Sequence, residues 1–310
     1  MLKYIISRIS QTVIVLIGVT LLTFILLNVA PGDPVAIMLE KRADAATMER
    51  VRHQLGLDRP LYIQYLDYIS KALRGDFGKS YFQKTPVFNM VVQGWKITIR
   101  LGGLSLLLAL SIGLVVGTIT AIMRGKWVDR LLMIVTMLGI SAPVFWIAVI
   151  FQIIFGLMLG WLPISGSGRP GWLIMPVVCL GISYGASSAR LIRTNMIDTL
   201  GEEYIRTARA KGLSEFLVIC KHALKSTSIP IITLAGMQLR SLICGAMVVE
   251  AVFSIRGIGS VSFNAIQARD IPIIQGCVLY IATVYVLINL IIDLLYGVLD
   301  PRIRLNARAK

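Results

Sequence analysis

Charged side chains are scarce in this sequence. They make up only 15% of its 310 residues, while 56% of the residues are hydrophobic; soluble domains carry about 25% charged residues. The apolar residues lie in long blocks, which is typical of a chain whose solvent is mostly lipid. The remaining charges are mainly basic, with 31 Lys and Arg against 16 Asp and Glu. Because these cations cluster between apolar blocks, they indicate membrane topology and contact with anionic headgroups rather than nucleic-acid binding.

Residues that carry enzyme chemistry are equally sparse. The two histidines, His53 and His222, and the four cysteines lie far apart, so the sequence shows no metal-ligand spacing, C-x-x-C pair or disulfide framework. It also contains no Ser/His/Asp set or H-E-x-x-H motif, which argues against a membrane enzyme, and no G-x-x-x-x-G-K-[ST] loop for ATP. We therefore expect no catalytic residue, bound cofactor or metal site in this chain.

Six apolar segments are long enough to cross a bilayer, which needs about 20 residues. They cover residues 9–30, 98–123, 131–157, 172–189, 229–253 and 273–299. The first is longer than the ~7–15 apolar residues of a signal peptide, so we expect a retained helix that ends in the turn at 31–34. The fourth is rich in small residues, which let helices approach closely in lipid, and should lie inside the bundle. The expected fold class is an all-α integral membrane protein.

Residues 31–97 form the only large polar region, between an N-terminal segment with the first helix (1–30) and a five-helix core (98–310). Helical apolar spacing predicts helices over 47–55 and 61–73, followed by a turn at 75–78, so we expect a small helical extracytoplasmic cap. Most Lys and Arg of the other loops lie on the same side as the N-terminus. The two short loops on the opposite side hold only Arg169, Arg256 and Arg269. The positive-inside rule therefore predicts that both termini are cytoplasmic.

A polar loop of about forty residues, approximately 190–228, connects the fourth and fifth spans. Residues 204–211 are strong helix formers, Gly212 suits a left-handed C-cap, and Ser214 can cap a second helix. The loop should therefore form a short helix, a glycine bend and another helix on the cytoplasmic face. On these residues alone, docking into a soluble partner and a solvated basic loop beside anionic lipid are equally good interpretations.

This loop resembles the ATPase-docking loop of ABC importer permeases, in the peptide/nickel branch that includes dipeptide, oligopeptide, glutathione and nickel permeases. The resemblance covers nearly the whole chain, including residues 27–34, 56–61, 75–78, 249–250, 257–259, 269–270 and 293–302. It implies the type I ABC importer permease fold. The docking residues that it implies are Glu203, Tyr204, Arg206, Thr207, Ala208, Arg209, Ala210, Lys211, Gly212 and His222.

The loop departs from the wider importer pattern, in which E-A-A precedes the glycine and I-x-L-P follows it. Arg206-Thr207-Ala208 occupies the first position and His222-Ala223-Leu224-Lys225 the second. This is the variant of the peptide branch, so the departure narrows the family. Arg206, Arg209 and Lys211 can pair with carboxylates on the docked ATPase.

Ionisable residues within spans indicate functional sites. Arg240 lies near the middle of the fifth span, and we expect it to face the bundle or a water-filled path. Glu250 lies near the outer end of the same span, where it can pair with Arg256 or Arg269 and hold an outer gate shut. These four residues are the candidate translocation path or gate.

The resemblance implies a permease subunit of an ATP-driven importer that works by alternating access in the cytoplasmic (inner) membrane of a bacterium. The implied partners are a second permease, expected to be a distinct homologue, two ATPases that bind ATP and Mg²⁺, a substrate-binding protein and membrane lipid. Peptides are the first expected substrate, with nickel (free or chelated) and glutathione as alternatives. A channel or secondary transporter is a remote alternative, which would keep working without the ATPases.

Overall fold

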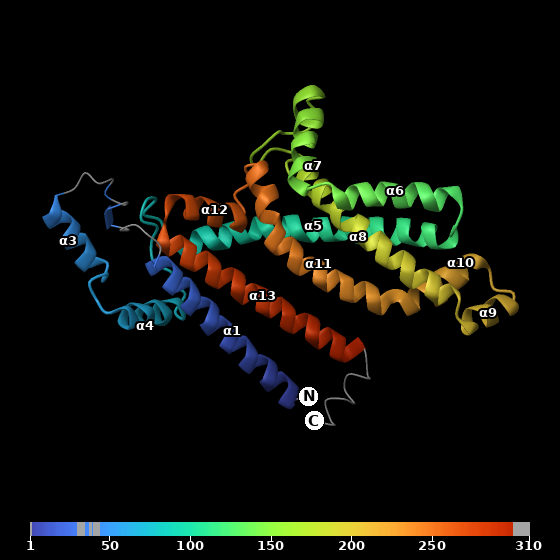
Figure 1. Ribbon diagram of the computed structural model, residues 1–310, viewed down its shortest axis with the longest axis horizontal. Coiled ribbons are helices and arrows are strands. Elements are labelled where there is room, and N and C mark those ends of the chain that lie inside the picture. The colour runs from blue at the N-terminus through green and yellow to red at the C-terminus, as the bar shows by residue number, and fades with distance from the viewer. Residues whose placement is uncertain (1, 30–34, 37–38, 40–43, 300–310) are drawn as a thin grey trace. The chain divides into compact units, whose positions relative to one another are not determined.

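A computed structural model describes residues 2–29, 35–36, 39 and 44–299 (Figure 1). Within these residues every long element is helical. In chain order they are α1 (Leu2–Val29), α3 (Ala45–Gln54), α4 (Leu61–Ala72), α5 (Val87–Ile122), α6 (Trp127–Ser141), α7 (Val144–Phe151), the π-helical η1 (Gln152–Met158), α8 (Ile174–Leu200), α9 (Glu203–Ala210), α10 (Glu215–Leu217), η2 (Val218–Ala223), α11 (Leu224–Val252), α12 (Ile258–Ala268) and α13 (Ile271–Leu299).

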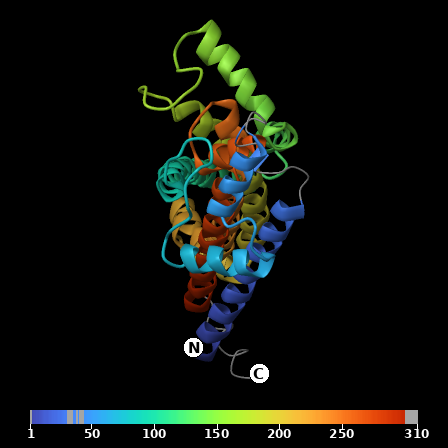
Figure 2. The same ribbon diagram turned by 90° about the vertical axis from the view of Figure 1, so that its left-hand side faces the viewer.

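The chain forms two compact units. Of the described residues, those up to 97 and those from 256 to 293 make the first unit, and residues 98–255 with 294–299 make the second. The first unit thus contains α1, the cap helices α3 and α4 (in the foreground of Figure 2), α12 and most of α13. The second contains α6 to α11 and most of α5.

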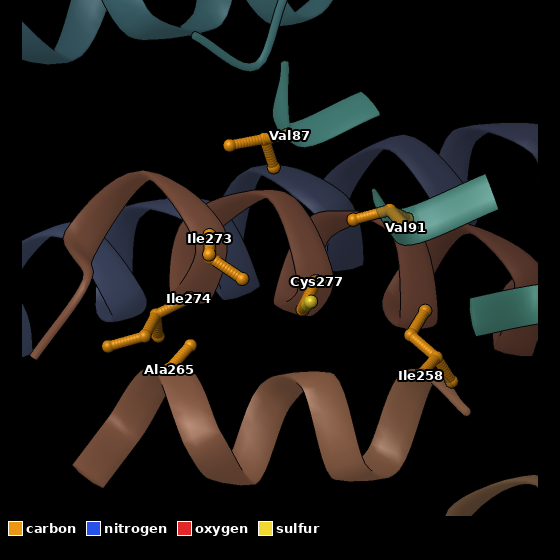
Figure 3. Close-up of a cluster of buried hydrophobic side chains, with 7 residues drawn as sticks. All are labelled: Val87, Val91, Ile258, Ala265, Ile273, Ile274 and Cys277. Atoms are coloured by element: carbon orange, nitrogen blue, oxygen red, sulfur yellow. The ribbon is translucent and has the colours of Figure 1, made fainter. Parts of the chain in front are cut away.

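The core of the first unit lies where the start of α5 meets α12 and α13. Figure 3 shows side chains from α12 and α13 pointing into the space between them, with two valines of α5 beside them. The buried members are Val87, Val91, Ile258, Ala265, Ile273, Ile274 and Cys277. The sequence did not predict α12. Its apolar residues follow helical spacing only over a short segment, which is hard to recognise beside the much longer spans.

The core of the second unit depends on close contact between α5 and α8. A Cβ atom added at Gly113 would lie 2.3 Å from Cβ of Ser188, and one at Gly117 would lie 2.8 Å from the carbonyl oxygen of Ala189. Small residues allow this approach in lipid, where helices attract one another through packing rather than through a hydrophobic effect. α8 also packs against α6, α7 and α11. Half of its apolar window is buried, compared with 11% for α1, which confirms the expected interior position of the fourth span.

Among the described residues, five helices are long and apolar enough to cross a membrane, and a bent helix pair makes a sixth span if it is counted as one. The expected all-helical membrane fold is therefore confirmed. Several helices run beyond the apolar segments that suggested them, and α5 and α8 have the longest extensions. α5 begins at Val87 rather than near residue 98, and α8 continues to Leu200. Hydropathy marks only the part of a helix that lies in lipid, so such extensions escape it.

The third expected span, 131–157, is not one helix. α6 ends at Ser141, α7 begins at Val144, and the two directions differ by 98°. Ala142 between them is extended, with φ −77° and ψ 127°. Pro143 explains the break, because proline lacks a backbone N–H and moves the preceding residue out of the helical region.

The two helices predicted in the cap are present as α3 and α4, with ends that differ by at most two residues from those expected. The turn predicted after them is also present. Gly75 and Gly78 have φ of 77° and 75°, and the Gly78 N–H donates to Oδ1 of Asp76 at 2.9 Å. The turn expected at residues 31–34 lies outside the described residues.

The α5–α8 contact predicts a sharp difference between two glycines of the same helix. Gly113→Ala places a methyl group 2.3 Å from Cβ of Ser188, whereas Gly103→Ala meets no atom within 4 Å. Overpacking of this kind costs about 1–3 kcal/mol. We expect Gly113→Ala to lower the apparent Tm of the detergent-purified protein by several degrees and Gly103→Ala to leave it unchanged. Equal Tm values for the two variants would contradict the described contact.

Candidate functional site

The predicted loop between the fourth and fifth spans contains α9, which is attached to the second unit by one face. Ile205 and Ala208 are buried in a cluster with residues of α5, α8, η2 and α11. The opposite face of α9 and the turn after it are exposed; the residues there are Glu203, Tyr204, Arg206, Thr207, Arg209, Ala210, Lys211 and Gly212. Of the sequence-predicted docking residues, Ala208 is thus the one whose side chain packs against the bundle, and His222 lies half-buried in η2.

The bend after α9 has the geometry that the glycine predicted. Gly212 has φ 77°, and its N–H donates to the carbonyl of Arg209 at 2.9 Å, while the Leu213 N–H reaches the carbonyl of Ala208 at 3.4 Å. These two bonds are those of a Schellman C-cap. Ser214 occupies the N-cap position of α10, but its side chain makes no capping hydrogen bond. The backbone turn therefore depends on Gly212 rather than on Ser214.

Two of the loop cations already bind acidic residues of the loop itself. Arg209 donates from Nε and Nη2 to the two carboxylate oxygens of Glu215, at 3.1 and 2.6 Å. This charged hydrogen bond raises the pKa of Arg209 above its ordinary value. Arg206 donates to Glu203 at 3.3 Å. Within the described residues, Lys211 makes no ion pair, so its ammonium group is available to an acidic partner.

A second ion pair joins α6 to α8 near the start of the loop. Arg193 donates from Nε and Nη2 to the two carboxylate oxygens of Asp129, both at 2.8 Å, and the Gly125 N–H donates to Asp129 at 3.0 Å. The Asp129 side chain is only 6% exposed. Sequence reasoning missed this pair, although Asp129 is the single acid among the cations of residues 124–130 and could have been noticed on that ground.

A buried polar contact joins α8 to α11. Gln238 donates from Nε2 to the carbonyl of Tyr184 at 3.0 Å and to Oγ of Ser188 at 2.8 Å. Within the described part of the chain, Oε1 of Gln238 and the buried Oγ of Ser105 have no hydrogen-bond partner. Because an unsatisfied polar atom away from water costs free energy, these two oxygens make the Gln238 contact less stabilising than the glycine contact beside it. A glutamine within an apolar span was the available sequence signal.

The candidate gate residues have different surroundings. Glu250 is fully buried, and its carboxylate accepts a hydrogen bond from Oγ1 of Thr98 at 2.5 Å. Arg240 is half-buried and donates from Nε to the carbonyl of Gly236 at 3.4 Å. Arg256 and Arg269 are exposed. Thr98 is thus a partner of Glu250 that sequence reasoning missed, and the pairing of Glu250 with either arginine stays a prediction.

The first unit holds a buried carboxylate next to one of these arginines. Asp270, 2% exposed, accepts from the Ser80 hydroxyl at 2.5 Å and from the Tyr81 N–H at 3.3 Å. Burial, and secondarily the nearby carboxylate, raises the pKa of Tyr81 to about 12. These bonds tie the segment before α5 to the turn between α12 and α13. Sequence reasoning selected Arg269 here, whereas the buried member of the dipeptide is Asp270.

Possible metal ligands are dispersed. Among the residues that the structure describes, no group of three or more His, Cys, Asp or Glu side chains could hold a metal ion. Cys179 and Cys277 are buried and Cys220 is exposed, each as a free thiol.

Comparison with known proteins identifies the class. Residues 113–305 match the family described as binding-protein-dependent transport system inner membrane component, and residues 1–102 match the N-terminal family of such membrane components. The chain belongs to this family of ABC importer permeases. It is a multi-pass permease subunit and not itself the catalytic subunit, because ATP hydrolysis in such importers is carried by a separate chain.

The chain is also similar to particular relatives and solved structures. The glutathione transport system permease protein GsiC of Escherichia coli strain K12 and that of Shigella flexneri serotype 5b are each 40% identical over 304 residues, which is 98% of this chain and 99% of the relative. Two structures of the MetNI methionine ABC transporter in inward-facing conformations match with TM-scores of 0.59 and 0.55 at 17% and 18% identity. Each match covers 68% of this chain and 96% of the other, and it shows a shared fold.

Proposed function

We propose that this permease imports small peptides across the bacterial inner membrane, with glutathione as a leading candidate among them. The observation that carries the coupling part of the proposal is the α9 element, whose buried face holds it to α8 while its polar face is exposed. A short helix presented in this way fits a groove on a soluble partner. The match to ABC importer permeases supports an ATPase as that partner.

The exposed loop supports a specific division of roles. Ile205 and Ala208 attach α9 to the bundle, so a push on α9 is passed to α8 through packed side chains. Arg209 is held by Glu215, which stiffens the bend, and Lys211 remains for an acidic group of the ATPase. Two ATPases with ATP and Mg²⁺, a second permease that is a distinct homologue, and a substrate-binding protein complete the importer. Rocking of the bundle then opens the path to one side at a time.

The orientation follows from the same assignment. With α9 facing cytoplasmic ATPases, both termini lie in the cytoplasm and the cap with α3 and α4 lies outside. The distribution of Lys and Arg in the short loops supports this orientation independently. In this arrangement the cap meets the substrate-binding protein.

The proposed substrate class combines two observations. The sequence resembles the peptide/nickel branch, and the relatives at 40% identity are named for glutathione, which is itself a tripeptide. The described residues offer no cluster of metal ligands, and this favours a peptide over free nickel. Nickel in a chelate remains the second candidate.

We also propose that Glu250 helps to close the outer end of the path. Its carboxylate is fully buried and accepts a hydrogen bond from Thr98, which belongs to α5, while Glu250 belongs to α11. Two helices joined by a buried charged hydrogen bond separate at a cost of about 1.5–3 kcal/mol. An outward-open state that parts these helices would have to break this bond, so the closed state is favoured until substrate and ATP bind.

Substrate identity is tested by uptake in a strain that lacks only this chain. We expect the strain to lose uptake of labelled glutathione or of labelled di- to pentapeptides and to keep uptake of radioactive nickel, and restoring the gene should reverse the loss. Normal uptake of glutathione and every peptide together with lost nickel uptake would overturn the peptide assignment in favour of a nickel chelate.

Coupling is tested at the glycine bend. Gly212→Pro cannot adopt φ 77° and loses the N–H that binds Arg209, so it disfavours the docking conformation by more than ~1 kcal/mol, or about fivefold. We expect normal membrane insertion with uptake reduced at least fivefold. Ser214→Pro is the matched control, because the φ of −63° at Ser214 already suits proline. Normal uptake by Gly212→Pro would contradict docking through this bend.

The gate is tested by Glu250→Gln in the reconstituted importer. The variant keeps the shape of the side chain and removes its charge, so the bond from Thr98 weakens and the closed state loses stability. We expect about a tenfold rise in ATPase activity without substrate, which corresponds to ~1.4 kcal/mol. Glu49→Gln, which alters an exposed acid of α3, is the control. Unchanged basal ATPase activity and uptake in Glu250→Gln would exclude the gating role.

A further inference from the structure

The first unit contains a cavity of about 400 Å³ beneath the cap. Its walls come from α4, from the loop before α4, from the segment at residues 76–84, and from the ends of α1 and α13. Tyr65 holds α4 against α1, because its hydroxyl lies 3.0 Å from Oγ1 of Thr20 and its ring lies 5.5 Å from that of Phe24. Tyr68 fixes one wall by donating to the carbonyl of Gln275 at 3.3 Å.

The ends of two spans place this cavity at the membrane boundary. Phe24, Leu27 and Asn28 line it from the last turns of the span Ser10–Val29. Ile271 and Gln275 line it from the first turns of the span Ile271–Ile292. A cavity lined by the same-side ends of two spans lies at the level of the lipid headgroups.

The cavity carries an excess of positive charge. Asp67 and Lys71, both in its lining, pair with each other at 2.7 Å, and Asp76 accepts the Gly78 N–H. The other charged lining residues are Arg59, Lys79 and Lys84, and none of these three makes an ion pair within the described residues. Because Asp76 keeps its negative charge, the four cations and two carboxylates of the lining carry a net charge of +2, which favours an anionic ligand.

An apolar groove adjoins the cationic cavity. A second cavity of about 260 Å³ shares Phe24 and Asn28 with the first and continues between α1 and α4, where Leu21, Ile25, Leu61 and Tyr62 line it. Leu21 is 42% exposed, Ile25 46% and Tyr62 67%. The groove thus opens toward the surface of α1 that faces lipid, as expected for a helix whose apolar window is 11% buried.

We propose that the two cavities together bind one phospholipid with an anionic headgroup, its phosphate among Arg59, Lys79 and Lys84 and an acyl chain in the groove between α1 and α4. The cations of the first cavity favour an anionic headgroup. The apolar groove beside them, at the level of the membrane, favours a ligand that also has an acyl chain. A free phosphate or a small peptide would use the cations but would gain nothing from the groove. The lipid would hold the cap against the membrane end of α1, independently of the substrate that the importer carries.

Native mass spectrometry of the delipidated importer complex, supplied with phosphatidylglycerol or with phosphatidylcholine of the same acyl chains, tests the site. We expect the complex to retain one more phosphatidylglycerol than phosphatidylcholine. Because each cation near an anionic headgroup contributes about fivefold in affinity, Lys79→Gln/Lys84→Gln should weaken this retention about 25-fold. Arg74→Gln removes an exposed cap cation that lines neither cavity and should change nothing.

A second variant addresses the acyl chain. Ile25→Trp fills the groove without altering a charge and should also abolish retention of the extra phosphatidylglycerol. Equal retention of the two lipids, or unchanged retention by both variants, would overturn the proposal. Displacement of the lipid by glycerol phosphate or by glutathione at equal concentration would also overturn it, since the cavity would then bind a solute.

Discussion

The close approach of α5 and α8 is the contact on which the second unit depends. In lipid every backbone polar group must be satisfied within its own segment, so the spans are helices and can attract one another only through packing and a few polar bonds. Gly113 and Gly117 let the backbone of α8 come against α5, and this places Ser188 and Arg193 where they meet α11 and α6. The polar contacts are therefore consequences of the glycine contact.

This arrangement also explains how a surface loop can act on the bundle. Ile205 and Ala208 of α9 share one buried cluster with Ile192 and Met196 of α8. Cores packed at crystal-like density move as bodies rather than deforming continuously. In the proposed coupling, a displacement of α9 is passed to α8 as a whole, and α11 follows because Gln238 donates a hydrogen bond to Ser188.

Much of the fold was predictable because it follows from local chemistry. Hydropathy located the spans, helical spacing located α3 and α4, and the need for positive φ located the bend at Gly212. The missed features depend on distant residues. Arg193 and Asp129 are 64 positions apart, and Thr98 and Glu250 are 152 apart, so no local pattern could pair them.

The break at Pro143 was missed for a different reason. Its signal was present in the sequence, but the apolar residues on both sides of the proline satisfied the length test for a single span. The Arg209–Glu215 pair is local, yet it crosses a glycine turn, and helical spacing rules do not extend across such a turn.

The same break has a consequence for the surrounding bilayer. α6 has 15 residues, and at about 1.5 Å per residue it is ~22 Å long, shorter than a hydrocarbon layer of ~30 Å. After the 98° bend, α7 no longer adds to its height. A span made of α6 alone would be matched by a locally thinner bilayer, at a cost that grows with each ångström of hydrophobic mismatch. The permease should accordingly be more stable in thin membranes than in thick ones, whatever solute it carries.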